Sequence, residues 1–113
     1  MLVAPADTGI RERLARLLLA QGETDRARLL LADAVAERPA DPEVRLLLAE
    51  TELRAGHRTD ALRELNRAAA LAGDDALLWA RLSEGYRNAG DAASAARANS
   101  RAQPAPGTPA RKP

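Results

Sequence analysis

Glycines recur along this 113-residue chain at a constant spacing of 34 residues, at Gly22, Gly56 and Gly90. Leucines and small residues keep the same register: Leu14, Leu48 and Leu82; Ala15, Ala49 and Ser83; Ala27, Ala61 and Ala95; Ala34, Ala68 and Ala102. A constant period of this length indicates repeated copies of one structural unit, each of which stacks on the next to bury its apolar face. The chain is therefore expected to form a repeat array.

The repeat frames cover residues 8–41, 42–75 and 76–109 without insertion. Each frame predicts two helices that meet at its glycine, because a glycine just past a helix end adopts the left-handed backbone conformation at little cost. Alanine makes up 27 of the 113 residues and is the best helix former. Three helical hairpins are the expected result.

The predicted helix starts rest on capping residues. Asp41, followed by Pro42 and Glu43, should cap the first helix of the second frame, and Asp75 the first helix of the third. Thr59 should cap a second helix that runs to Leu71, and Thr24 should do the same in the first frame. The last helix is expected over residues 92–103, with no large apolar side chain to hold it firmly.

Charge and composition exclude several classes of protein. The 17 basic and 16 acidic residues leave a net charge of +1, which argues against a nucleic-acid binder held by bulk charge and against a polybasic membrane anchor. The chain has no cysteine for disulfides or zinc, and no apolar run long enough to span a membrane. No catalytic constellation or phosphate-binding loop is evident, so no enzyme activity and no cofactor are expected.

The two ends differ from the repeats. Residues 1–7 form a short leader without the basic start and apolar core of a secretory signal, so a cytoplasmic protein is expected, or a periplasmic one if the chain is a fragment of an exported protein. Residues 104–113 hold four prolines and a glycine and are expected to form a disordered tail or linker.

The pattern resembles the tetratricopeptide repeat family. The residues that carry the resemblance are Leu14, Ala15, Leu18, Gly22, Ala27, Leu31, Ala34 and Pro39; Leu48, Ala49, Gly56, Ala61, Leu65 and Ala68; and Trp79, Leu82, Ser83, Tyr86, Gly90, Ala95 and Ala102. The departures are Arg11, Arg45, Glu52, Asn99 and Gly73. The resemblance implies an all-α fold, an α-solenoid of three helix-turn-helix units in a right-handed superhelical array.

The resemblance also implies a concave groove lined by the first helix of each unit. The candidate partner-binding residues are Arg13, Arg16, Leu46, Leu47, Glu50, Leu53, Arg54, Leu77, Arg81, Glu84 and Arg87. Leu46, Leu47 and Leu53 are not needed for the seam between helices, so they are expected to expose apolar surface to a partner. Arginines can grip carboxylates, although Glu12–Arg16 and Glu50–Arg54 are spaced to form ordinary pairs on one helix.

Two functions follow. The first is a non-enzymatic scaffold that binds a peptide or helix of a partner protein in the groove. The alternative is self-association through the terminal repeats, as part of a larger assembly such as those that similar arrays serve in bacterial envelope biogenesis or secretion. The carboxylate clamp by which some family members bind a chaperone is not expected, because only Arg16 and Arg81 of its five positions are suitable.

Three further features are given structural interpretations. Trp79 and Tyr86 are spaced for one helix face and are expected in the repeat core rather than as a platform for nucleic-acid bases. His57 has no suitable companion near it in the sequence, so no metal site is expected there. Asp74 and Asp75 are expected to belong to a helix start rather than to an acid–base pair.

Overall fold

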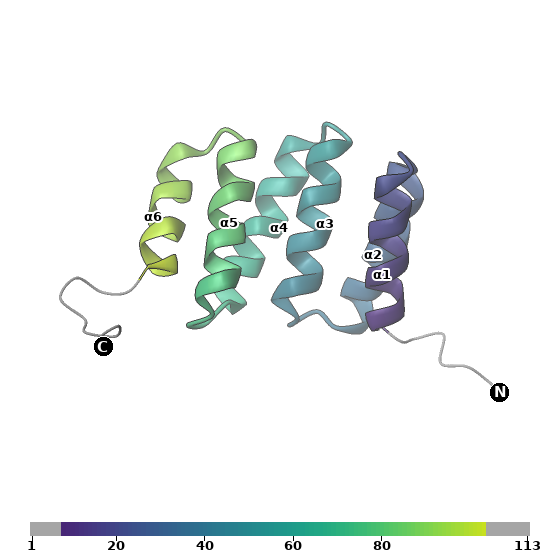
Figure 1. The fold of residues 1–113 in the computed structure, drawn as a ribbon, viewed down its shortest axis with the longest axis horizontal. Coiled ribbons are helices and arrows are strands. Elements are labelled where there is room, and N and C mark those ends of the chain that lie inside the picture. The colour runs from purple at the N-terminus through teal and green to yellow at the C-terminus, as the bar shows by residue number, and fades with distance from the viewer. Residues whose placement is uncertain (1–7, 104–113) are drawn as a thin grey trace.

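The computed structural model describes residues 8–103, and in this range it contains helices and no strands. The helices are α1 (Thr8–Ala20), α2 (Thr24–Glu37), α3 (Pro42–Arg54), α4 (Arg58–Leu71), α5 (Ala76–Asn88) and α6 (Ala92–Ala102). They stand side by side as three antiparallel hairpins in one row (Figure 1). The predicted all-α repeat fold is confirmed, whereas the expectations for the leader (1–7) and the tail (104–113) lie outside the described residues.

The three hairpin turns have the same backbone geometry. Gly22, Gly56 and Gly90 have φ angles of 79°, 83° and 83°, in the left-handed region that favours glycine. At the second turn, the N–H of His57 donates to the carbonyl of Glu52 at 2.8 Å, a bond that closes the end of α3. The same bond recurs in the other two turns, so the predicted role of these glycines is confirmed.

Helix starts follow the prediction only in part. The carboxylate of Asp41 accepts from the N–H groups of Glu43 and Val44 at 3.0 and 3.4 Å, and Asp75 caps α5 in the same way. The predicted threonine caps are wrong: the N-cap residues of α2 and α4 are Glu23 and His57, and neither cap side chain makes a capping bond. The tight glycine turn brings each helix start forward, so both threonines lie inside the first turn. Asp91 caps α6, which the sequence analysis missed.

Small residues bring the two helices of each hairpin close together. Ala15 packs in the seam of the first hairpin and Ala49 in that of the second, both fully buried. Ser83 stands at the equivalent place in the third, where its hydroxyl donates to the carbonyl of Ala95 at 2.9 Å and is thereby satisfied. A methyl group on Gly85 would lie 2.8 Å from the Leu65 side chain, so this helical glycine is explained by its packing against the preceding hairpin.

Leucines stack the hairpins on one another, and this corrects one expectation. Leu46, which was expected to face a partner, is fully buried in the cluster that joins α3 to α4, α5 and α6. Leu47 and Leu48 belong to the other cluster, which joins α3 to α1 and α2. The side chains of α3 are therefore buried on both sides, because this helix has a neighbouring hairpin on each side.

The two ends of the row present different surfaces. Leu14 is 44% exposed, although the equivalent Leu48 and Leu82 are buried against the preceding hairpin. At the other end, Asn99 is exposed at the place where Leu31 and Leu65 pack against a following hairpin. The α1 end is thus apolar and the α6 end polar. Within residues 8–103, no helix has both the length and the apolar character needed to cross a membrane.

Candidate functional site: the groove of the first helices

A groove of about 630 Å³ lies where α1, α3 and α5 line one side of the row. Its lining residues are Arg16, Leu19, Ala20, Leu47, Glu50, Leu53, Arg54 and Asn88. Five of the predicted partner-binding residues are among them: Arg16, Leu47, Glu50, Leu53 and Arg54. Three hairpins thus bring together side chains that are far apart in the sequence.

The floor of the groove is apolar but only narrowly exposed. Leu19 and Leu47 are 8% and 3% exposed, and both belong to the cluster beneath α1, α2 and α3. Leu53 is half-buried and packs against the other cluster. The expectation that Leu47 is free for a partner is therefore wrong in degree: the side chain is mostly a core residue, and only its edge reaches the groove.

Two arginines flank this floor. Arg16 of α1 and Arg54 of α3 are exposed and line the groove. Within the described residues, the predicted pairs Glu12–Arg16 and Glu50–Arg54 are not in ion-pair distance, and Glu50 lies 3.6 Å from Arg81 of the next hairpin instead. Both guanidinium groups therefore face the groove without a carboxylate in ion-pair distance among residues 8–103.

The remaining predicted site residues lie elsewhere. Arg81 bridges two hairpins, with its guanidinium 2.7 Å from Glu43 and 3.6 Å from Glu50, and so joins the array together. Glu84 and Arg87 pair with each other at 2.6 Å on the surface of α5. Arg13 and Leu77 are exposed outside the groove lining, and Leu77 is 80% exposed.

Burial shapes the electrostatics of the groove. Partial burial raises the pKa of Glu50 above its ordinary value, and the nearby Arg81 and Arg16 counteract part of this effect. Partial burial also raises the pKa of Glu12, and the negative charge of Asp41 adds to the rise. Arg16 and Arg54 outnumber the single carboxylate of the groove lining, Glu50, and this charge balance favours an anionic group on a bound partner.

The fourth position of each repeat shows how the departures from the family pattern are accommodated. Trp79 donates from Nε1 to the carbonyl of Gly73 at 2.7 Å, as a buried indole N–H requires. Arg45, at the same position of the preceding repeat, donates from Nε to the carbonyl of Pro39 at 2.7 Å. Both carbonyls belong to the residue six places earlier, so the arginine replaces the aromatic ring without losing this bond. Burial of Trp79 and Tyr86 confirms their place in the core.

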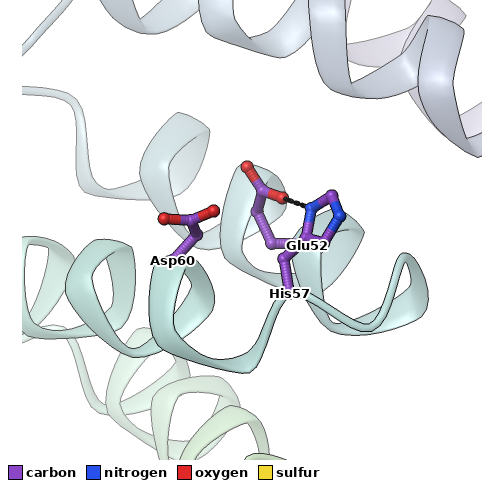
Figure 2. Close-up of side chains that lie close together, drawn as sticks. All are labelled: Glu52, His57 and Asp60. Carbon is purple, nitrogen blue, oxygen red and sulfur yellow. Dashed lines mark hydrogen bonds and ion pairs between the residues drawn. The ribbon is translucent and has the colours of Figure 1, made fainter.

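A histidine–carboxylate cluster lies at the turn between α3 and α4 (Figure 2). The carboxylate of Glu52 accepts a hydrogen bond from Nδ1 of His57 at 2.7 Å, and Asp60 brings a second carboxylate, with the three ligand atoms within 4.8 Å of one another. The expectation that His57 has no suitable companion is therefore wrong, because the turn folds residues of two helices together. These three residues could hold a divalent cation.

Arginines already neutralise this cluster. Nε of Arg28 lies 4.0 Å from Glu52, and Arg63 lies 2.8 Å from Asp60. A cation would have to compete with both guanidinium groups for the same oxygens. The contacts that are present make the cluster an ion-pair network that ties α2 and α3 to the start of α4.

Comparisons with known proteins agree with this architecture. A family model of the tetratricopeptide repeat matches residues 3–50 and 18–84. Among the solved structures, 14 chains match, including the structure of MamA MSR-1 C2, which has a TM-score of 0.63 and 19% sequence identity. That match covers 88% of this chain and 57% of the other, so the chain spans little more than half of that protein. No curated protein matches the sequence.

The chain belongs to the tetratricopeptide repeat family. The match covers most of the sequence, and the 34-residue period, the glycine turns and the small-residue seams all have the positions that the family requires. Repeats of this family generally mediate protein–protein interactions and are typically non-catalytic. The likeness to MamA MSR-1 C2 concerns the fold alone.

Proposed function

We propose that this chain is a non-enzymatic interaction module that binds a peptide or helix of a partner protein in the groove of α1, α3 and α5. The observation that carries the proposal is the pair of exposed arginines, Arg16 and Arg54, on either side of an apolar floor. A side chain of a partner can cover the floor while carboxylates of the same partner pair with the arginines. The partner sequence expected is an apolar residue with acidic neighbours.

A charge reversal in the groove tests the proposal without disturbing the core. Arg16→Glu combined with Arg54→Glu changes only exposed side chains, unlike a change at Leu47 or Arg81, which would weaken the array itself. The control combines Arg38→Glu with Arg67→Glu, which alters the net charge equally at exposed positions outside the groove. Partners would be captured from cell extract with each protein as bait and quantified by mass spectrometry.

The groove variant should lose the partners that the parent and the control both retain. A loss of at least tenfold in captured amount is expected, since each charged contact is worth about 1.5–3 kcal/mol. If the groove variant captures the same proteins in the same amounts as the control, the groove is not the partner site. Circular dichroism of each bait shows that it is folded.

Self-association is the second candidate, and the α1 end favours it. Leu14 and Leu17 are 44% and 55% exposed on α1, which gives this end of the row an apolar surface. The α6 end carries the exposed Asn99 instead, so a head-to-tail stack would place an apolar surface against a polar one. A symmetric pair of chains that meet at α1 is the arrangement that suits this chemistry. Light scattering of the parent and of Leu14→Glu with Leu17→Glu tests it: a parent that remains monomeric at high concentration removes this candidate.

A further inference from the structure

A second hollow, of about 440 Å³, lies between α4 and α6 and shares no residue with the groove. Trp79 and Tyr86 of α5 are aromatic residues of its lining. The rest of the lining comes from the second helices of two hairpins: Asn66, Ala69, Ser94, Arg97, Ala98, Ser100 and Arg101. The row therefore has one recess among its first helices and another between its second helices.

The hollow exists because the third repeat lacks a side chain that fills the same place in the second. Glu64 of α4 reaches Arg45 at 2.9 Å, and this pair occupies the space above the fourth position of the second repeat. One repeat later, Ala98 stands at the position of Glu64 and Trp79 at that of Arg45. An alanine side chain ends at Cβ, so no long side chain pairs across the fourth position here, and the guanidinium of Arg101 lies over the Trp79 ring instead.

The lining of the hollow fits two kinds of chemical group, an apolar side chain and a carboxylate. The polar atoms of the aromatic residues are already bonded, since Trp79 donates to Gly73 at 2.7 Å and Tyr86 donates to Asn66 at 2.7 Å. Both residues are buried, with Trp79 8% and Tyr86 4% exposed, so they present only a small area of ring to the hollow, which an apolar side chain covers best. The rim is cationic, because the sequence of α6 has two arginines and no acidic residue.

The two arginines of α6 are free to bind carboxylates. Arg101 lies over the Trp79 ring, with Cζ 4.7 Å from the ring centroid, and a guanidinium stacked by its face keeps N–H groups at its edge for other partners. Arg97 donates to the hydroxyl of Ser94 at 2.9 Å. Neither arginine forms an ion pair with a carboxylate of residues 8–103, in contrast to Arg45 and Arg63 of the preceding repeat.

We propose that this hollow is a second docking site, which binds an acidic segment of a partner protein by placing one aromatic or aliphatic side chain in the recess beside Trp79 and pairing carboxylates with Arg97 and Arg101. Charge complementarity selects the acidic partner, and the alanine and aromatic side chains of the lining select the apolar anchor. Because the two recesses share no residue, the module can hold two partners at once. This inference does not depend on the groove having a ligand.

The test uses the fact that Trp79 is the single tryptophan of the chain, so its fluorescence reports on the hollow directly. The probe is a synthetic peptide with one phenylalanine flanked by glutamates on both sides, added to the full chain at low salt. Saturable change in Trp79 emission is expected. The peptide with serine for phenylalanine, and the peptide with lysines for glutamates, should each bind at least tenfold more weakly.

Variants separate the hollow from general attraction of an acidic peptide. Ala98→Met fills the space without changing the charge and should weaken binding at least tenfold, as should Arg97→Glu with Arg101→Glu. Arg38→Glu with Arg67→Glu carries the same charge change at exposed positions outside both recesses and should leave the affinity within about twofold. Affinity of the charge variants is also measured by anisotropy of a labelled peptide. This second measurement is needed because Arg101 lies on the Trp79 ring, so its substitution changes the emission even without peptide.

Three results would overturn the proposal. One is a Trp79 emission that does not respond to the acidic peptide. Another is unchanged affinity in Ala98→Met, which would mean that the hollow is not occupied. The third is an equal response to a short oligonucleotide or to anionic lipid vesicles, which would make the site a general anion-binding surface. Thermal unfolding of each variant confirms that it is folded, and Ala98→Ser provides a milder change at the same place.

Discussion

The second and third hairpins solve the same packing problem with opposite chemistry. In α3 the fourth and eleventh positions of the repeat hold Arg45 and Glu52, and in α5 they hold Trp79 and Tyr86. All four side chains are buried, and each of the four makes a polar contact at its end. The difference teaches that the fourth position of the repeat requires a long side chain with an N–H donor more than it requires an aromatic ring.

The two solutions leave different surroundings. The two charged residues of the second hairpin have long partners: Glu64 of α4 pairs with Arg45, and His57 at the turn between α3 and α4 pairs with Glu52. The aromatic pair in the third hairpin is satisfied by a backbone carbonyl and by Asn66, so the neighbouring positions can be small. A filled, ionic seam and an open, aromatic one are the result.

The largest expected effect is the loss of the indole. Trp79→Ala should lower the free energy of unfolding by about 4 kcal/mol, because it removes a large buried side chain and leaves a cavity among α4, α5 and α6. Urea unfolding followed by circular dichroism measures it. Arg101→Ala removes only the cation stacked on the ring and should cost about 1 kcal/mol or less. Equal losses in the two variants would show that the ring does not support the third hairpin.

The next effect concerns the ionic seam. Arg45→Ala should cost about 3 kcal/mol, because it leaves the carboxylate of Glu64 half-buried without its partner. Arg45→Trp combined with Glu64→Ala copies the third repeat into the second and should restore stability to within about 1 kcal/mol of the parent, since an apolar replacement of a buried pair is often neutral. A double-mutant cycle on urea unfolding measures the coupling. If the double variant is less stable than either single one, the two seams are not interchangeable.

A smaller effect on stability distinguishes the start of α3, a first helix of its hairpin, from the start of α4, the second helix. Asp41→Ala should cost about 1 kcal/mol, because it removes the acceptor for two N–H groups at the start of α3. Thr59→Ala, in the first turn of α4, should change stability by less than about 0.5 kcal/mol, since the residue is exposed and makes no capping bond. Thermal melts of both variants compare them directly. A larger loss at Thr59 would reverse the assignment of caps.

The smallest effect is a pH dependence at the groove. The pKa of Glu50 is raised in the folded state by burial, so the folded chain takes up a proton at this site at higher pH than the unfolded chain. The contribution of Glu50 to stability is therefore least favourable above the raised pKa. It becomes more favourable as the pH falls from the raised pKa of the folded chain to the ordinary pKa of the unfolded chain. Glu50→Gln should remove this rise and should stabilise the chain at pH 7 by about 0.5 kcal/mol or less, because solvent screens a partly exposed group.

The measurement is the free energy of unfolding of parent and variant between pH 7 and about pH 4. Glu84→Gln is the matched control, because Glu84 stands at the equivalent position of the third repeat but is exposed. Glu84→Gln should leave the difference between the free energies of unfolding at pH 7 and at about pH 4 the same as in the parent. A parent whose stability falls more steeply than that of Glu50→Gln over this range would contradict the assigned sign.

Much of the fold could be predicted from the sequence because it depends on local rules. The glycine turns, the aspartate caps of α3 and α5 and the helix end at Leu71 each depend on a few neighbouring residues. The threonine caps failed for the same local reason, since the turn that precedes them advances the helix start by one residue at α2 and by two at α4. For Trp79 and Tyr86 the repeat register was sufficient to predict burial.

The site was predicted less completely, because it depends on which hairpins lie beside each helix. Leu46 was taken for a surface residue, yet α4 and α5 cover it. Glu50 was assigned to an arginine one turn away on its own helix, but Arg81 reaches it from the next hairpin. His57 has no partner in the local sequence pattern, and the turn brings Glu52 and Asp60 to it. None of these contacts follows from spacing along one helix.

The amino-acid sequence by itself determined the period, the hairpins and the seams, because turns, caps and small-residue contacts are decided over distances of a few residues or one repeat. Only the tertiary structure decided which arginines are paired and which remain open to a partner, and where a recess is left between the helices. The physical reason is that ion pairs and cavities depend on the lengths of side chains that meet from different hairpins. Glu64 pairs with Arg45 in one repeat, whereas Ala98 at the same position of the next repeat lines a hollow.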